Sequence, residues 1–452
     1  MSSATLAMRL PVVVRTLIAA ALFALAAGSC GCAVRQAADP LRASAVHCET
    51  PASFVWPERD TAEVESRIAM QPGKHRLYVA GLDDLRGKVR PYIWSGEVEV
   101  LCRRPSGRGL LCEVRRVDSE PAWYDPRVFM FYTSQTPVMR ADRTLTTLPP
   151  GLRELDGTPM DGVIYRLRPE SRGVPGTRGI VVALRPLSGS TYIRPVIAEL
   201  RDRGWTVIES SLGFGLSGVG DERDAKNDQD LENYGRHIGQ IANERLSEWA
   251  YGCEAMVDMV RRERPALEDK PVVVVGFSAG AIGAPTVAAR LAEQCGGGGG
   301  VGGVAGVVLV GGGVNIARIA QTSSLSDFGF GVTFQGKKLT GEKLDRFSDA
   351  YLEAATLDSY HTAAALRRTP ALILQADADD IVPVEAGHAL YEQLGCPERW
   401  VFGGGHELLF LELGFFDNQI ADWIDGHVPC GSSAARASNL TANRTSGRLG
   451  KP

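Results

Sequence analysis

The feature that most constrains the fold is the five-residue stretch Gly276-Phe277-Ser278-Ala279-Gly280, which separates two segments of different character. Residues 271–275 (PVVVV) form a β-branched run, typical of a central parallel strand that is buried on both faces. Residues 280–294 (GAIGAPTVAARLAEQ) are rich in Ala and Gly and predict a helix. The chain must therefore turn sharply from strand into helix at Ser278, and the small residues around it let the turn pass close to its neighbours.

Strand and helix patterns alternate on both sides of this turn, from about residue 155 to residue 428. Apolar or β-branched runs predict the strands, and apolar residues at helical spacing predict the helices. This alternation favours an α/β fold with a mostly parallel sheet that helices cover on both faces. The predicted strands are residues 161–169, 179–184, 204–210, 271–275, 306–312, 370–377 and 399–404, and the predicted helices are residues 190–203, 236–263, 280–294, 384–394 and 416–425.

The stretch before this alternation has another pattern. Four runs that suit short strands are separated by Gly, Pro and Asp, and no long helical period appears; the runs are residues 75–82, 90–102, 110–117 and 127–133. We therefore divide the chain into a small β-rich N-terminal domain over 30–150 and an α/β domain over 151–430. Cys102 and Cys112 flank a turn between two of the runs, and a cross-strand disulfide and two buried thiols are both open interpretations.

The two ends of the sequence predict no part of the fold. Residues 1–29 resemble a signal peptide, in which two arginines precede an apolar run that is short for a bilayer span. Small residues lead into Cys30, as in the cleavage box of a bacterial lipoprotein, so we expect an exported protein with lipid on Cys30. An ordinary secretory signal, giving a periplasmic or secreted protein, and an uncleaved anchor are the alternatives. Residues 431–452 are polar and small, which predicts a disordered tail.

Composition and motifs exclude several classes of function. The formal net charge of −4 argues against a basic nucleic-acid-binding protein. Residues 213–218 match G-x-G-x-x-G, but polar residues follow where a dinucleotide site needs an apolar helix, so we expect a flexible wall of the active-site cleft instead. The metal-binding patterns H-E-x-x-H and paired C-x-x-C are absent, and we expect neither a metal nor a cofactor.

Ser278 is the expected nucleophile. The strand-to-helix turn exposes its hydroxyl above the sheet, and the N-terminus of the next helix favours negative charge that develops there. Serine needs a base, usually a histidine that a carboxylate orients, and both partners follow later strands. His406 lies on a glycine-rich loop directly after a predicted strand, whereas His388 falls within a predicted helix and His427 follows the last one. His406 is therefore the expected base.

The expected acid lies in the segment DADDIVP at the end of the strand over 370–377. A carboxylate at this place can accept the Nδ1–H of the histidine and stabilise the imidazolium. The spacing Asp-x-Ile-Val-Pro selects Asp379, and Asp377 and Asp380 are the alternatives.

The motifs GFSAG, DADDIVP and GGGHE together resemble the α/β-hydrolase fold superfamily, near its dienelactone-hydrolase-like and esterase branches. The resemblance covers residues 155–428 and implies that Ser278, Asp379 and His406 form a hydrolytic triad. It also implies an oxyanion hole formed by the backbone N–H groups of Leu187 and Ala279.

One loop departs from the pattern of that superfamily. Arg185 and Pro186 stand where a His-Gly pair is usual, and Pro186 has no N–H to donate. Arg185 either pairs with an acidic group of the substrate or lies on the surface of the loop; both interpretations are open.

These observations predict a serine hydrolase that cleaves small carboxylic esters through an acyl-enzyme. A peptidase or amidase is one alternative, suggested by the additional N-terminal domain. A catalytically inactive, lipid-anchored protein is another, suggested by the Arg-Pro replacement. We expect the segment over 314–366 to contain a lid that selects the substrate.

Overall fold

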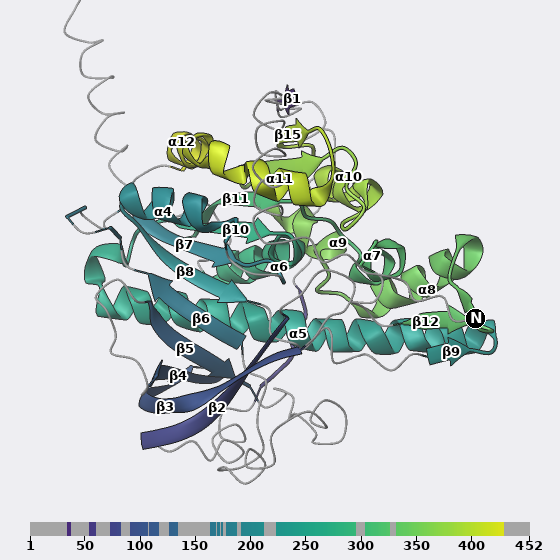
Figure 1. Ribbon diagram of the computed structural model, residues 1–452, viewed down its shortest axis with the longest axis horizontal. Coiled ribbons are helices and arrows are strands. Elements are labelled where there is room, and N and C mark those ends of the chain that lie inside the picture. The colour runs from purple at the N-terminus through teal and green to yellow at the C-terminus, as the bar shows by residue number, and fades with distance from the viewer. Residues whose placement is uncertain are drawn as a thin grey trace, which may run out of the picture.

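The computed structural model describes most of the chain between residues 34 and 428 (Figure 1). The predicted signal peptide, Cys30, the glycine pattern at 213–218 and the tail over 431–452 lie outside the described residues. The described ranges are 34–37, 54–59, 73–82, 91–106, 108–116, 126–133, 163–168, 170–171, 173–174, 178–187, 191–211, 223–294, 303–325 and 331–428.

A single large sheet runs through these ranges and contains six adjacent parallel strands. They lie in the order β15-β14-β11-β10-β7-β8, so the strand that precedes Ser278, β10, is in the middle. The predicted α/β fold with helices around a parallel sheet is confirmed. The bounds are β7 Gly179–Leu184, β8 Trp205–Ser211, β10 Val272–Phe277, β11 Val304–Val310, β14 Ala371–Ala376 and β15 Glu398–Phe402.

The N-terminal strands continue the same sheet in antiparallel order. They follow β8 as β6-β5-β4-β3-β2, and the short β1 pairs with β15 at the opposite edge. The strands predicted in this region are present. Leu111 of β4 and Phe129 and Phe131 of β5 belong to the same buried cluster as Val182, so these two strands share the core of the α/β part. The bounds are β1 Val34–Gln36, β2 Gly73–Leu82, β3 Pro91–Ser106, β4 Gly109–Arg116, β5 Arg127–Tyr132 and β6 Val163–Arg168.

The pairing of β3 with β4 decides between the two open interpretations of Cys102 and Cys112, a cross-strand disulfide and two thiols. A register shift between Val100 and Cys102 pairs Cys102 with Glu113, while Cys112 pairs with Arg103. Because a one-residue offset assigns the two positions to opposite faces of a sheet, a bridge between Cys102 and Cys112 does not fit.

Helices cover both faces of the parallel strands, as Figure 1 shows. One face carries α5, α6 and α10, and the other carries α4, α11 and α12. None of the helices in the described ranges is both long and apolar enough to cross a bilayer. The bounds are α4 Arg194–Asp202, α5 Asp228–Glu263, α6 Ala279–Gln294, α10 Val384–Gln393, α11 His406–Glu412 and α12 Asp417–His427.

Two predicted helices begin elsewhere than expected. The helix predicted from residue 190 begins at Arg194, and no side chain caps it; it ends before Gly204, whose φ of 89° suits glycine. The long helix α5 begins at Asp228 rather than 236, because the Asn227 side chain accepts a hydrogen bond from the backbone N–H of Asp230.

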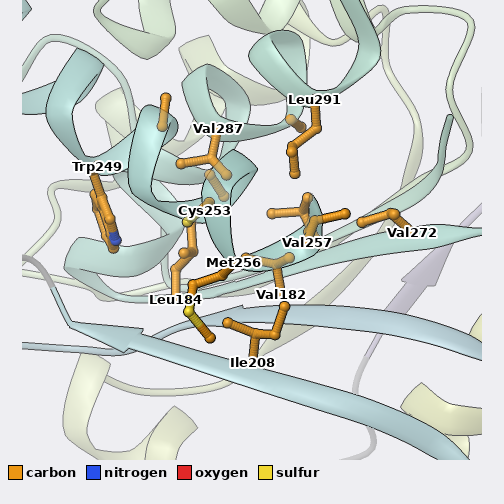
Figure 2. Packing of buried hydrophobic residues seen from close by; sticks show 14 of the residues in the cluster. Val182, Leu184, Ile208, Trp249, Cys253, Met256, Val257, Val272, Val287 and Leu291 are labelled. Carbon is orange, nitrogen blue, oxygen red and sulfur yellow. The ribbon is translucent and has the colours of Figure 1, made fainter. Parts of the chain in front are cut away.

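The core beneath the Ser278 turn is formed where α5 and α6 meet the sheet (Figure 2). Trp249 of α5 lies against α6, where a Cβ at Gly283 would be 2.4 Å from its ring. Its indole N–H donates a 2.6 Å hydrogen bond to Ser210 of β8. Figure 2 shows Val287 and Leu291 on the helix side and Val182 and Ile208 on the strand side of the same cluster. This packing holds α6, and with it Ser278, at a fixed height above the sheet.

The segment in which we expected a lid forms an accessory unit on the N-terminal half of α5. Its core includes Leu231, Ile238, Phe347 and Tyr351, and a small sheet in the order β13-β12-β9 completes it. Figure 1 shows this unit beyond the end of the large sheet. The bounds are β9 Arg223–Ala225, α7 Ile316–Thr322, β12 Val332–Phe334, β13 Lys337–Lys338, α8 Gly341–Ala354 and α9 Ser359–Thr362.

Candidate active site

Ser278 lies between β10 and α6 with a φ of 53°, a left-handed conformation that is strained for a residue with a side chain. The turn is tight on both sides. A Cβ at Gly276 would be 2.5 Å from Cα of Ala281, and a Cβ at Gly280 would be 2.0 Å from the carbonyl oxygen of Leu184. Only glycine fits these two positions, which accounts for the spacing of the motif around Ser278.

His406 is the first residue of α11 and follows the glycine-rich loop after β15. Its Nε2 lies 2.9 Å from the hydroxyl oxygen of Ser278, and its Nδ1 lies 2.7 Å from Oδ2 of Asp379. With the proton on Nδ1, the imidazole donates to Asp379 and accepts from the Ser278 hydroxyl. The imidazole is also held from the side by the ring of Phe410, 5.0 Å away between centroids.

Asp379 is the carboxylate that meets His406, and its side chain is only 1% exposed. Its second oxygen, Oδ1, accepts hydrogen bonds from the backbone N–H groups of Ile381 at 3.1 Å and Val382 at 2.8 Å. These bonds orient the carboxylate and satisfy it inside the protein, where an unpartnered charge would be costly.

The alternatives for the acid and the base lie apart from the Ser278 hydroxyl. The carboxylate of Asp377 accepts a 2.7 Å bond from the backbone N–H of Gly404 and so shapes the loop that carries His406. Asp380 has an exposed side chain. His388 lies 3.5 Å from Glu392 on the exposed side of α10, and His427 binds the backbone carbonyl of Trp423.

Gly311, directly after β11, lies beneath the imidazole. Its φ is +60°, and a Cβ there would be 2.9 Å from Cε1 of His406. The position of His406 therefore depends on a glycine that the sequence motifs did not single out. The available signal was the run of three glycines that ends the strand over 306–312.

The two expected oxyanion donors lie on either side of the turn. Ala279 is the first residue of α6, so its N–H is at a helix N-terminus, and Leu187 lies on the loop after β7 with 44% of its surface exposed. Within the described residues, neither N–H has a hydrogen-bond acceptor. A Cβ at Gly280 would be 3.0 Å from the carbonyl oxygen of Arg185, which shows that the β7 loop packs directly on the Ser278 turn.

Arg185 is not a surface residue of that loop: its side chain is 15% exposed and its Nε is buried without a hydrogen bond. The nearest described carboxylate is Glu209 of β8, 3.9 Å from that Nε. Burial lowers the pKa of Arg185, and Glu209 opposes this shift. Sequence reasoning missed Glu209 and Arg166 as neighbours, because their pairing depends on the register of β6 with β8.

The arrangement can move a proton. His406 can take the hydroxyl proton of Ser278 while Asp379 stabilises the imidazolium that results, which turns a weak nucleophile into a strong one. Among the described residues, no group of three or more His, Cys, Asp or Glu side chains could hold a metal ion.

Comparison with known proteins places the chain in a family. A search of curated proteins gave no match. Similar solved structures include Est1E from Butyrivibrio proteoclasticus (16% identity, 59% of this chain and 94% of that chain, TM-score 0.39). A thermostable carboxyl esterase from Bacillus coagulans is also similar (15% identity, 60% and 95%, TM-score 0.35). The family model of the alpha/beta hydrolase family matches residues 174–415, which include the Ser278 turn and both of its partners, and the chain belongs to this family.

Proposed function

We propose that the protein is a serine hydrolase that cleaves carboxylic esters through an acyl-enzyme. The observation that carries the proposal is the continuous pair of hydrogen bonds from the Ser278 hydroxyl to His406 and from His406 to the buried Asp379. A hydroxyl, an imidazole and a carboxylate in this order are the parts that acyl transfer needs, and the strained turn at Ser278 exposes the first of them.

In the first half of the reaction, the Ser278 oxygen attacks the ester carbonyl while His406 Nε2 takes the hydroxyl proton. The same nitrogen then gives that proton to the leaving alcohol, which yields the acyl-enzyme. In the second half, His406 deprotonates a water molecule that attacks the acyl group, and Ser278 recovers its proton. Asp379 stays ionised and holds the Nδ1–H tautomer throughout.

The tetrahedral intermediate carries an oxyanion that needs donors. The N–H groups of Ala279 and Leu187 are the candidates, and the dipole of α6 adds to the first of them. Each donor in such a hole contributes roughly 3–4 kcal/mol of transition-state stabilisation. Pro186 cannot donate a hydrogen bond to the oxyanion, since its nitrogen has no proton. The donor on this loop is therefore the next residue, Leu187.

The position of the N-terminal strands favours ester substrates over peptides. A gating domain was the reason to consider a peptidase, yet β2–β5 extend the sheet at the edge far from β10, with β6, β8 and β7 between them. The described strands in that position extend the sheet away from the Ser278 turn.

A fluorophosphonate probe tests the proposal, because it reacts with a serine only when the base and the oxyanion donors are in place. We expect stoichiometric labelling of the wild type and none of Ser278→Ala, together with hydrolysis of p-nitrophenyl acetate and butyrate. Folded wild-type protein, checked by circular dichroism, that neither reacts with the probe nor hydrolyses either ester would contradict the proposal and favour the inactive alternative.

We also propose, from the first 30 residues, that the protein is exported and carries lipid on Cys30. The mass of the mature N-terminal peptide tests this. A peptide that begins at Cys30 with added acyl groups supports it, and an unmodified N-terminus at another residue contradicts it.

A further inference from the structure

A cluster of arginines lies on the α4 face of the sheet, beside the Ser278 turn. Arg166 of β6 pairs in register with Glu209 of β8, and Glu209 pairs with Ala183 of β7. Residues that are directly opposite on paired strands share a face. Arg168 lies two residues along β6 and Arg185 two residues beyond Ala183, so all three guanidinium groups converge on the face that carries Glu209.

This cluster has more positive charge than its described carboxylate can neutralise. Glu209 is 3% exposed and forms its close ion pair with Arg168. Arg185 stays 3.9 Å from the other oxygen, and neither Nε of Arg185 nor Nη1 of Arg166 has a hydrogen bond, although both atoms are buried. Within the described part of the chain, Arg166 has no hydrogen bond and no ion pair at all.

Such an arrangement is costly in the free protein. Burial, followed by the charge of Arg185, lowers the pKa of Arg166 to about 10, although Glu209 acts in the opposite direction. A buried guanidinium is ordinarily paired, because removing its charge from water carries a free-energy cost that a nearby anion offsets. An anion bound between Arg166 and Arg185 would supply the missing partner.

The arginine cluster and His406 lie on opposite sides of the nucleophile. The loop with His406 comes after β15, on one side of β10 in the sheet, and β7, β8 and β6 lie on the other side. The leaving alcohol must face His406, which gives it a proton, so the acyl part of a bound ester faces the arginines. Arg185 follows the strand next to β10, and Arg166 lies three strand spacings away, about 14 Å at the usual spacing.

We propose that Arg166 and Arg185 form an anion subsite for the acyl part of the substrate, and that the preferred substrates are esters whose acyl chain ends in a carboxylate, that is, monoesters of dicarboxylic acids. This inference rests on the proposed esterase function and adds the substrate class. The planar fork of a guanidinium suits a carboxylate, and two arginines without a hydrogen-bonded partner among the described residues can bind both of its oxygens.

Kinetics with matched esters test the subsite. Mono-p-nitrophenyl adipate and p-nitrophenyl hexanoate have the same chain length and differ in the terminal carboxylate. We expect Arg166→Gln and Arg185→Gln each to lower kcat/KM for the adipate ester by about tenfold or more and to change kcat/KM for the hexanoate ester less than about threefold. The control is Arg178→Gln at the other end of β7, where the arginine already has Asp425 as its partner.

Equal losses on both esters, or no preference of the wild type for the adipate ester, would overturn the proposal. If the hexanoate ester is still hydrolysed and Ser278 still reacts with a fluorophosphonate, the esterase function stands and only the anion subsite fails.

Binding of adipate to Ser278→Ala, measured by calorimetry at constant ionic strength, tests the subsite without catalysis. We expect saturable binding that is at least about tenfold weaker once Arg166→Gln is added, and no measurable binding of hexanol. Absence of adipate binding to Ser278→Ala would mean that the arginines are neutralised within the protein, and the proposal would be wrong whatever the activity.

Discussion

The two sides of Ser278 differ in how they treat buried charge. On the β14–β15 side, Asp379 accepts three hydrogen bonds and no oxygen is left without a donor. On the β6–β7 side, Glu209 forms its close ion pair with Arg168, Arg185 lies 3.9 Å from the same carboxylate, and Arg166 has no ion pair among the described residues. The hydrogen bonds of the first side are all formed in the free protein, because catalytic groups must be in place before the substrate binds. The second side lacks an anion for Arg166 and Arg185, which agrees with the proposal that these arginines bind a carboxylate of the substrate.

The largest expected effect is the loss of kcat when Ser278 or His406, on the fully hydrogen-bonded side of the site, is replaced. Ser278→Ala and His406→Ala each remove one end of the 2.9 Å bond, and we expect each to lower kcat by roughly 10⁵- to 10⁶-fold. The double variant should lose little more, because the two groups act as a unit. Ester turnover by the purified proteins measures this, with the exposed His427→Ala as the control that retains its activity.

The next largest expected loss of kcat comes from replacing the acid, Asp379. Asp379→Asn keeps the shape but favours the wrong tautomer of His406, and we expect kcat to fall by about 10⁴-fold. Asp380→Asn should change kcat less than about threefold, because that side chain is exposed and does not meet His406. Similar losses in the two variants would show that Asp379 has no special role.

Gly311→Ala tests whether the position of His406 matters as much as its chemistry. The new Cβ, 2.9 Å from Cε1, should displace the imidazole and lower kcat by about 10- to 100-fold. Gly336→Ala is the matched control: its φ is also positive, at +75°, but no atom lies within 4 Å of the added Cβ. Both variants should lose about 1–2 kcal/mol of stability from backbone strain, and only Gly311→Ala should lose activity.

The smallest expected effect is on the free energy of unfolding, which should differ between the loss of a paired arginine and the loss of an unpaired one. Arg290 is buried and bonded to Glu254 at 2.7 Å, so Arg290→Met should lower the free energy of unfolding by about 3 kcal/mol. Arg166→Met removes a buried charge without a described partner and should leave that free energy unchanged or raise it by about 1 kcal/mol. Urea denaturation compares the two, and equal destabilisation would mean that Arg166 is paired in the free protein.

The sequence predicted those parts of the molecule that depend on local patterns. The strand before Ser278, the turn itself and the loops with Asp379 and His406 each have a short motif, and the chain order of the motifs matches the family. The early start of α5 was missed because its first turn is polar and relies on Asn227 as a cap. The register of paired strands could not be predicted: a register shift after Val100 within the β3–β4 hairpin separates the two cysteines, and the register of β6 with β8 brings Arg166 to Glu209.

The central claim, that an ester is cleaved through an acyl group on Ser278, is tested most directly by mass spectrometry of the trapped intermediate. Wild-type protein is mixed with excess p-nitrophenyl butyrate, quenched in acid within milliseconds and digested. We predict one added butyryl group on the peptide that contains Ser278 and none in the Ser278→Ala protein. An active enzyme without this adduct, or with the acyl group on another residue, would contradict the account.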